Sequence, residues 1–501
     1  MVPNSLRPKV FFPPFVLLIS GIVLGITFQK SFLIAATEIH QRILHLLGPI
    51  YSLVAFLMVF VCFIVFYSPL GRIRIGGVDA KPELTRWQWF TITLCSTVAC
   101  GLLFWSCAEP IFHYYQPPAS APDSNFIFAL AGLILHWTLT PYAIYAVPAL
   151  VFALNYHNLK SDFSFASCLH PLVSQSVSKK FKGLIDSLCL YSLVIAMAGA
   201  LAAGILLMSG GLNYLFLIPK TNTSIMCITL AFIITFTTAA ISGVTKGVRL
   251  LADWNVRLFL VLMVYVLCFA DIGQMFRLSS SSLIFYGRHF VELSLWPNVH
   301  ATDSWGFQWG VFSWAMWMSW APVTALFLGR IAKGYTVREF IMMNFLLPAL
   351  CSFVWISIFG TLALSTIPLD SVYNQLMAQG PESVVYLLMS KMPYAKPLIM
   401  VFVFTCFLSF VTAADANLIA MADLSAQGDH LGEKTIIKML WGASLGLISY
   451  FTVVYAGTDG IKMLSNFSGI PALLLLFLVL LSLIKLIIHS VTSGCLKILP
   501  E

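Results

Sequence analysis

Charged residues are scarce in this sequence. Of its 501 residues only 10% are Asp, Glu, Lys or Arg, whereas 59% are hydrophobic. An average soluble domain has about 25% charged residues, so this chain has too little charge to cover a surface that faces water. Its net charge of +8 comes from short clusters between apolar segments, without the basic patch and interleaved aromatics typical of nucleic-acid binding. The composition excludes a soluble fold and predicts a polytopic membrane protein.

Patterned cysteines and histidines are also missing. Eleven cysteines occur, but none forms a CxxC pair or has a nearby histidine at zinc-ligand spacing, which argues against a disulfide framework or zinc site. The histidines are dispersed along the chain, and Asp186, Asp253 and Asp415 are expected at or near span ends. Asp253 and Arg257 have the i, i+4 spacing of a helical ion pair. We therefore predict no catalytic residue, no metal site, no cofactor and no enzyme activity.

Long apolar runs predict the topology. A membrane-spanning helix needs about 20 apolar residues, and the runs that qualify define twelve spans at 11–29, 48–68, 87–108, 125–156, 184–218, 223–243, 254–273, 305–330, 337–366, 394–424, 435–457 and 468–489. An even number of spans places both termini on one side. Most Lys and Arg lie in the N-terminus and the even-numbered loops, which predicts that both termini are cytoplasmic in a bacterial inner membrane.

The spacing of the spans indicates an internal repeat. Segments 273–303 and 368–393 have mixed apolar and polar helical patterns, and we expect both to form external amphipathic helices. They separate the spans into two leading helices and two sets of five, the arrangement of an inverted-repeat transporter. The expected units are 1–86 with the leading helices, 87–273 as the first repeat, 274–304 as the external helix, 305–489 as the second repeat, and 490–501 as a short cytoplasmic tail.

Aromatic residues concentrate in two of these spans. At about 100° per residue, Trp314, Trp317 and Trp320 of the eighth span fall within about 120° and form one stripe. The fourth span has a second set within about 140°, and Pro141 is expected to bend the helix there. This second set consists of Trp137, Tyr142 and Tyr145.

Two facing sets of aromatic rings suit one kind of ligand. A trimethylammonium group cannot donate hydrogen bonds, so a protein recognises it by surrounding its diffuse charge with π-faces, at about 2 kcal/mol per desolvated contact. The pattern predicts an aromatic site for a quaternary-ammonium compound. A carrier for an amino acid or another organic cation, built on the same inverted repeats, is the alternative, since fold alone does not decide the substrate.

Several ordered motifs resemble the betaine/carnitine/choline transporter (BCCT) family. The most specific runs from Trp314 through Ser319-Trp320-Ala321-Pro322 to Arg330-Ile331-Ala332-Lys333-Gly334, and shorter matches are Ala108-Glu109-Pro110 and His136-Trp137. The resemblance covers essentially the whole chain. It implies a LeuT-like fold of twelve transmembrane helices, a homotrimer, and transport of glycine betaine, choline, carnitine or butyrobetaine by alternating access.

The resemblance also implies a binding site. The family's aromatic box falls on Trp137, Tyr142, Tyr145 and Trp317, which the stripe extends to Trp314 and Trp320. This sequence departs from the better-known members at Tyr142 and at Met316, where they have tryptophan. Tyr142 keeps a π-face and Met316 keeps polarisable bulk, so cation recognition is expected to persist.

The sequence is compatible with two mechanisms of energy coupling. Sodium requires oxygen ligands, and this sequence lacks several hydroxyls that sodium-coupled members of the family have, for example where Ala413 follows Thr412. The chain therefore resembles the sodium-independent carnitine/butyrobetaine exchangers, but it lacks the arginine that they have near the position of Asn255 and the methionine that they have near the position of Thr324. Arg257 is the candidate substitute for this arginine. Thr97, Thr412 and Arg257 are the candidate ion or coupling residues, and a sodium-coupled betaine symporter is the alternative.

Overall fold

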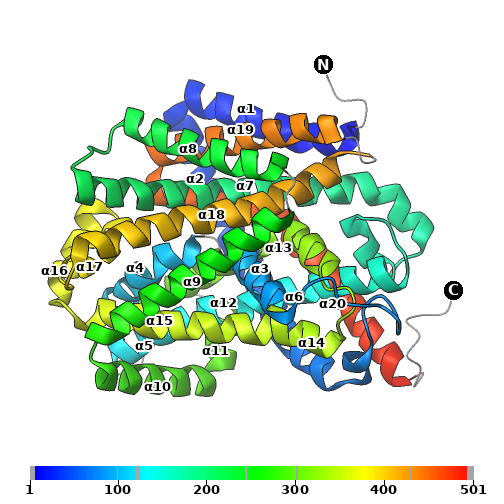
Figure 1. Cartoon of the computed structure of the whole chain (residues 1–501), viewed down its shortest axis with the longest axis horizontal. Helices are drawn as coiled ribbons and strands as arrows, with labels where there is room; N and C mark the ends of the chain where they lie inside the picture. The colour runs from blue at the N-terminus through cyan, green and yellow to red at the C-terminus, as the bar shows by residue number, and fades with distance from the viewer. Residues whose placement is uncertain are drawn as a thin grey trace.

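The computed structural model describes residues 6–492, except 99, 119–120, 122–123, 243–244, 301–302 and 428–430, and this part of the chain is almost entirely helical (Figure 1). Its α-helices are α1 (Pro8–Thr27), α2 (Gln29–Tyr67), α3 (Arg86–Val98), α4 (Gly101–Tyr115), α5 (Asn125–Trp137), α6 (Leu139–Ala153), α7 (Gln175–Phe216), α8 (Asn222–Ser242), α9 (Thr245–Phe269), α10 (Ile272–Arg288), α11 (Phe290–Ser294), α12 (Trp296–Val299), α13 (Phe312–Arg330), α14 (Val337–Ile341), α15 (Leu347–Ser365), α16 (Leu369–Gln379), α17 (Glu382–Ser390), α18 (Ala395–Ser425), α19 (Leu431–Tyr455) and α20 (Gly457–Thr492). Short 3-10 or π turns are η1 (Pro69–Arg72), η2 (Leu154–Asn158), η3 (Phe165–Leu169), η4 (Gly306–Val311) and η5 (Met342–Leu346).

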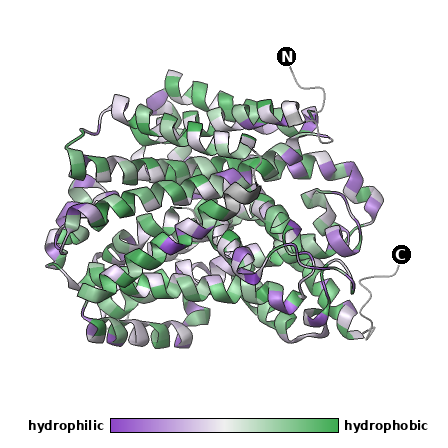
Figure 2. Ribbon diagram, viewed as in Figure 1, coloured by the Kyte–Doolittle hydropathy of each residue, from purple (hydrophilic) through white to green (hydrophobic). Residues whose placement is uncertain are grey.

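The prediction of a polytopic helical membrane protein is confirmed. Within the described residues, 11 helices are long and apolar enough to cross a membrane, and counting the bent pair α3 and α4 as one span gives up to 12. Figure 2 shows hydrophobic residues along most of the long helices and many hydrophilic residues toward their ends. The beginning of α1 and the end of α20 lie on the same side of the molecule in Figure 1.

The fourth span is broken at a different residue from the one predicted. The chain leaves helical geometry at Thr138, with φ −114° and ψ −112°, so that α5 ends at Trp137 and α6 begins at Leu139. Pro141 lies in the first turn of α6, where a missing N–H breaks no helical hydrogen bond. The break therefore precedes the proline by three residues, and the prediction of a bend at Pro141 was wrong.

The two predicted amphipathic segments are helical. Helices α11 and α12 lie within the first segment, α10 begins one residue before it at Ile272, and α16 and α17 lie within the second. Their external location remains a prediction, as do the boundaries of the five expected units. Residues 493–501 of the expected tail lie outside the described residues.

Helix α13 lies at the centre of the bundle and packs most extensively against α6 and α20 (Figure 1). The first span of each predicted repeat is irregular. In the first repeat this span bends by 57° between α3 and α4, and in the second repeat it begins with the π turn η4, which leads into α13. In a membrane protein, irregular backbone is tolerated where it is buried within the protein. The bend between α3 and α4 and the π turn η4 therefore lie inside the bundle, where other parts of the protein can pair their backbone groups.

A buried ion pair ties the N-terminus to this bundle. The Arg7 guanidinium donates to the carboxylate of Asp186 at 2.8 Å, and Asp186 is fully buried. Asp186 also accepts hydrogen bonds from the Ser164 hydroxyl at 2.6 Å and the Phe165 backbone N–H at 3.2 Å. Removing one partner of such a buried pair leaves the remaining charge without a counter-charge, which lowers the free energy of unfolding by about 3 to 5 kcal/mol.

We expect Asp186→Ala to lower the free energy of unfolding by about 3 kcal/mol, because Arg7 and two further donors lose their acceptor. The measurement is thermal unfolding of the purified protein in detergent, followed by intrinsic fluorescence. The matched control is Asp162→Ala, whose ion pair with Lys182 is largely solvent-exposed and contributes little. Equal midpoints for the two variants would contradict a structural role for Asp186.

Candidate functional site

Four buried aromatic side chains converge in the centre of the bundle. The ring centroid of Trp317 lies 5.3 Å from Trp137, 6.2 Å from Tyr142 and 5.7 Å from Tyr145. Trp317 comes from α13, Trp137 is the last residue of α5, and the two tyrosines lie in the first half of α6. The structure therefore brings together the four residues of the predicted aromatic box, with Trp317 in contact with each of the other three.

The broken fourth span positions these rings. Because α5 ends at Trp137, the backbone carbonyl of His136 has no helical donor, and it accepts a hydrogen bond from Trp317 Nε1 at 3.1 Å. On the other side of Trp137, Gly101 opens α4, and a Cβ at this position would lie only 2.9 Å from the indole ring. Gly101 thus leaves the space that Trp137 occupies.

The remaining predicted site residues lie in other surroundings. Trp314 is buried with its ring 5.7 Å from that of His136, and Trp320 is buried further along α13. Met316 is only partly buried and packs against the hydrophobic core. Of the predicted tryptophan stripe, Trp317 is the member that contacts the rings of Trp137, Tyr142 and Tyr145.

The candidate coupling residues are placed as follows. Thr97 and Thr412 are buried, and each hydroxyl donates at 2.9 Å to a backbone carbonyl one turn earlier in its own helix. The side chain of Arg257 is 57% exposed and forms the predicted ion pair with Asp253 at 2.7 Å. Its guanidinium also lies 5.5 Å from the ring of Trp254. Arg257 is therefore directed toward the surface rather than into the buried interior that holds the two threonines.

Asp415 differs from its prediction. It lies well inside α18 with 1% of its surface exposed, and its Oδ1 atom has no hydrogen-bond partner among the described residues. The expectation that it lies near a span end was wrong, because α18 continues to Ser425, almost three turns beyond Asp415.

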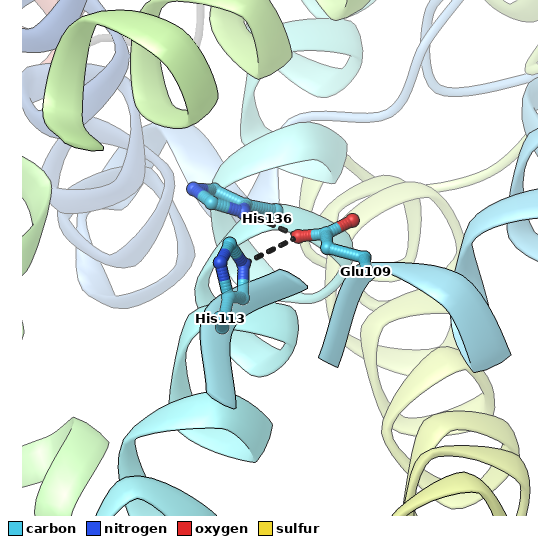
Figure 3. Close-up of side chains that lie close together, drawn as sticks. All are labelled: Glu109, His113 and His136. Atoms are coloured by element: carbon cyan, nitrogen blue, oxygen red, sulfur yellow. Dashed lines mark hydrogen bonds and ion pairs between the residues drawn. The ribbon is translucent and has the colours of Figure 1, made fainter. Parts of the chain in front are cut away.

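The structure also reveals a polar cluster next to the box (Figure 3). Glu109 Oε1 accepts hydrogen bonds from His136 Nδ1 at 2.6 Å and from His113 Nε2 at 3.1 Å. Glu109 Oε2 accepts from Trp137 Nε1 at 2.8 Å. Trp305 Nε1 donates to His113 Nδ1 at 3.1 Å, which fixes the His113 proton on Nε2. The carboxylate thus accepts three N–H groups, one of which belongs to the aromatic box.

The prediction that the histidines are dispersed was wrong at this point of the fold. Glu109 and His113 are one helical turn apart on α4, while His136 comes from α5. The i, i+4 spacing of Glu109 and His113, and the position of His136 directly before Trp137, were the available signals. Neither signal alone predicts that α4 and α5 are in contact.

The same three side chains have the spacing of a metal site, but their hydrogen bonds favour another role. One ligand atom from each of Glu109, His113 and His136 lies within 4.8 Å of the others. A metal would need the lone pair of His113 Nε2, but this nitrogen carries the proton because Trp305 donates to Nδ1. The geometry is that of a buried carboxylate held by donors, which in turn hold the indole of Trp137.

Comparison with known proteins places the chain in a family. A model of the betaine/carnitine/choline transporter family matches residues 9–491. The chain belongs to the BCCT family. BCCT proteins are membrane transporters and not enzymes, which agrees with the prediction made from the sequence.

The similar relatives are bacterial. The chain is 29% identical over 449 residues to a probable glycine betaine transporter of Desulfitobacterium hafniense, covering 87% of this chain and 89% of the relative. A glycine betaine transporter of Bacillus subtilis is 28% identical over 443 residues, covering 87% and 86%. An osmo-independent choline transporter of Acinetobacter baylyi is 26% identical over 499 residues, covering 96% and 94%.

We expect Glu109→Gln to destabilise this BCCT protein by about 2 to 3 kcal/mol, because the glutamine NH₂ group points toward N–H donors that the carboxylate accepted. Thermal unfolding in detergent measures the effect. Glu292→Gln is the matched control, since Glu292 lies on α11 with 40% of its side chain exposed. A midpoint as high for Glu109→Gln as for the control would show that the cluster does not depend on the carboxylate.

Proposed function

We propose that this BCCT protein is a secondary transporter of quaternary-ammonium compounds, and that Trp137, Tyr142, Tyr145 and Trp317 bind the ammonium group. The observation that carries the proposal is the convergence of three buried rings on Trp317, with centroids 5.3 to 6.2 Å away. Converging π-faces are the recognised means of binding a cation that cannot donate hydrogen bonds. Glycine betaine, choline, carnitine and butyrobetaine all have such a trimethylammonium group.

The relatives support the same class of substrate. Those from Desulfitobacterium hafniense and Bacillus subtilis are named as glycine betaine transporters, and the one from Acinetobacter baylyi is named as a choline transporter. The trimethylammonium group is common to the two compounds. A box that recognises this group is compatible with both, so the rest of the site decides between them.

Transport proceeds, in this proposal, by alternating access between two inverted five-helix repeats. The bend between α3 and α4 and the π turn η4 support it, since irregular first helices at a midplane site are a feature of inverted-repeat transporters. The protein works as a homotrimer in the bacterial inner membrane, with both termini in the cytoplasm. The excess of Lys and Arg on the side of the termini supports this orientation.

Sodium-independent exchange is the proposed mode of coupling. The hydroxyls of Thr97 and Thr412 already donate within their own helices, and the sequence lacks a second hydroxyl after Thr412. Arg257 does not replace a bound cation in this scheme, because its side chain is exposed and pairs with Asp253.

We expect Trp317→Ala to weaken the binding of glycine betaine or choline by about tenfold or more, because it removes the ring that the other three contact. Ligand titration of the purified protein measures the dissociation constant. Trp254→Ala is the control, since Trp254 is an exposed tryptophan on α9. An unchanged affinity in Trp317→Ala would exclude the aromatic box as the binding site.

Uptake into proteoliposomes tests the mode of coupling. We expect radiolabelled substrate to enter when unlabelled substrate is present inside, with or without a sodium gradient. Uptake that requires sodium would overturn exchange and identify a sodium-coupled symporter. A lack of uptake for glycine betaine, choline, carnitine and butyrobetaine alike would exclude the proposed substrate class and favour a carrier for amino acids or other organic cations.

A further inference from the structure

The buried carboxylate of Glu109 is one hydrogen bond away from the aromatic box. Its Oε2 atom accepts from Nε1 of Trp137 at 2.8 Å, and in Figure 3 this oxygen is directed away from both His113 and His136. Only 2% of the surface of Glu109 is exposed, so water and salt screen its charge very little. A buried charge is therefore in direct contact with one of the four rings proposed to bind the substrate.

The hydrogen bonds around Glu109 leave this group of side chains with a net negative charge. Trp305 donates to Nδ1 of His113 at 3.1 Å, so His113 has a single proton, on Nε2, and is neutral. His136 donates from Nδ1 to Glu109 at 2.6 Å, and its buried Nε2 has no hydrogen-bond partner among the described residues. A proton on Nε2 would create a charged ring with an unpaired buried donor, which is costly, so His136 is neutral as well.

A lysine offsets part of this negative charge from a greater distance. Lys462 of α20 interacts electrostatically with Glu109. Its Nζ atom lies 4.2 Å from the ring centroid of Trp309, and the ring of Trp309 lies 4.8 Å from that of His113. Lys462 is thus linked to the cluster through other rings, whereas Glu109 contacts Trp137 itself. The charge that touches the box is therefore the carboxylate.

A carboxylate on the indole N–H makes Trp137 a better binder of cations. The face of an aromatic ring is negative and its edge is positive, and an anionic acceptor at the N–H edge polarises the ring further in the same direction. A cation over the face lies within about 6 Å of the ring centroid, which places it about 6 to 8 Å from Glu109. At this separation in a partly buried site, the attraction corresponds to on the order of tenfold in affinity or more.

We propose that Glu109 is a specificity-determining residue that acts through Trp137, and that its carboxylate makes the aromatic box select a positively charged trimethylammonium group over a neutral group of the same shape. The inference rests on the proposed function, since it assumes that the box binds the trimethylammonium group. The aromatic faces fit the shape of this group, and the negative charge behind Trp137 adds selection for its charge.

The test compares ligands of the same shape that differ in one charge. The pairs are choline and glycine betaine, each with its tert-butyl analogue, in which a carbon atom replaces the quaternary nitrogen. The measurement is the dissociation constant of each ligand for the purified full-length protein, and the ratio of the two constants within a pair is the charge preference. We expect the wild type to bind the ammonium ligand on the order of a hundredfold more tightly than its analogue.

We expect Glu109→Gln to reduce the charge preference about tenfold, because the side chain keeps its size and loses its charge. Damage to the shape of the site alone would weaken both ligands of a pair equally and leave their ratio unchanged. Glu109→Met is the second neutral variant if Glu109→Gln does not fold. Glu292→Gln is the matched control and should leave the charge preference unchanged, since Glu292 lies on α11 with 40% of its side chain exposed.

The outcomes separate this role of Glu109 from the proposed function. An unchanged charge preference in a folded neutral variant, with the wild type preferring the ammonium ligands, would overturn the role of Glu109. Failure of the wild type to bind either choline or glycine betaine, or binding without a charge preference, would instead overturn the proposed function.

Discussion

The carboxylate of Glu109 is the interaction on which the centre of this protein depends. A charge within a membrane-embedded bundle is costly unless donors surround it, and three N–H groups point at this one. The donors come from His113 on α4 and from His136 and Trp137 on α5. Since His113 accepts from Trp305, just before η4, one carboxylate joins both irregular first spans and fixes the indole of Trp137, one of the four rings of the aromatic box.

Breaks in the helices place the functional side chains. A bilayer requires backbone groups to be paired within the protein, so an interrupted helix must find other partners. The break at Thr138 leaves the backbone carbonyl of His136 without a helical donor, and Nε1–H of Trp317 on α13 donates a hydrogen bond to it. The bend before Gly101 brings a residue without a side chain against Trp137. The same irregularities that interrupt the spans therefore create the contacts between α4, α5 and α13.

A contact from another helix anchors one ring of the aromatic box. The hydroxyl of Tyr142 hydrogen-bonds with Ser352 of α15 at 2.6 Å, which fixes the ring of Tyr142 relative to α15.

The sequence by itself determined the membrane class, the number of spans to within one, and the family, because apolar runs and ordered motifs are local properties. It also named the four residues of the box, through helical spacing and the family motif. Only the tertiary structure decided that the chain breaks at Thr138 rather than bends at Pro141, that Arg257 faces the surface, and that Glu109, His113 and His136 lie beside the box. These residues come from different helices, and their proximity depends on how those helices pack, which hydrophobic periodicity along one segment does not specify.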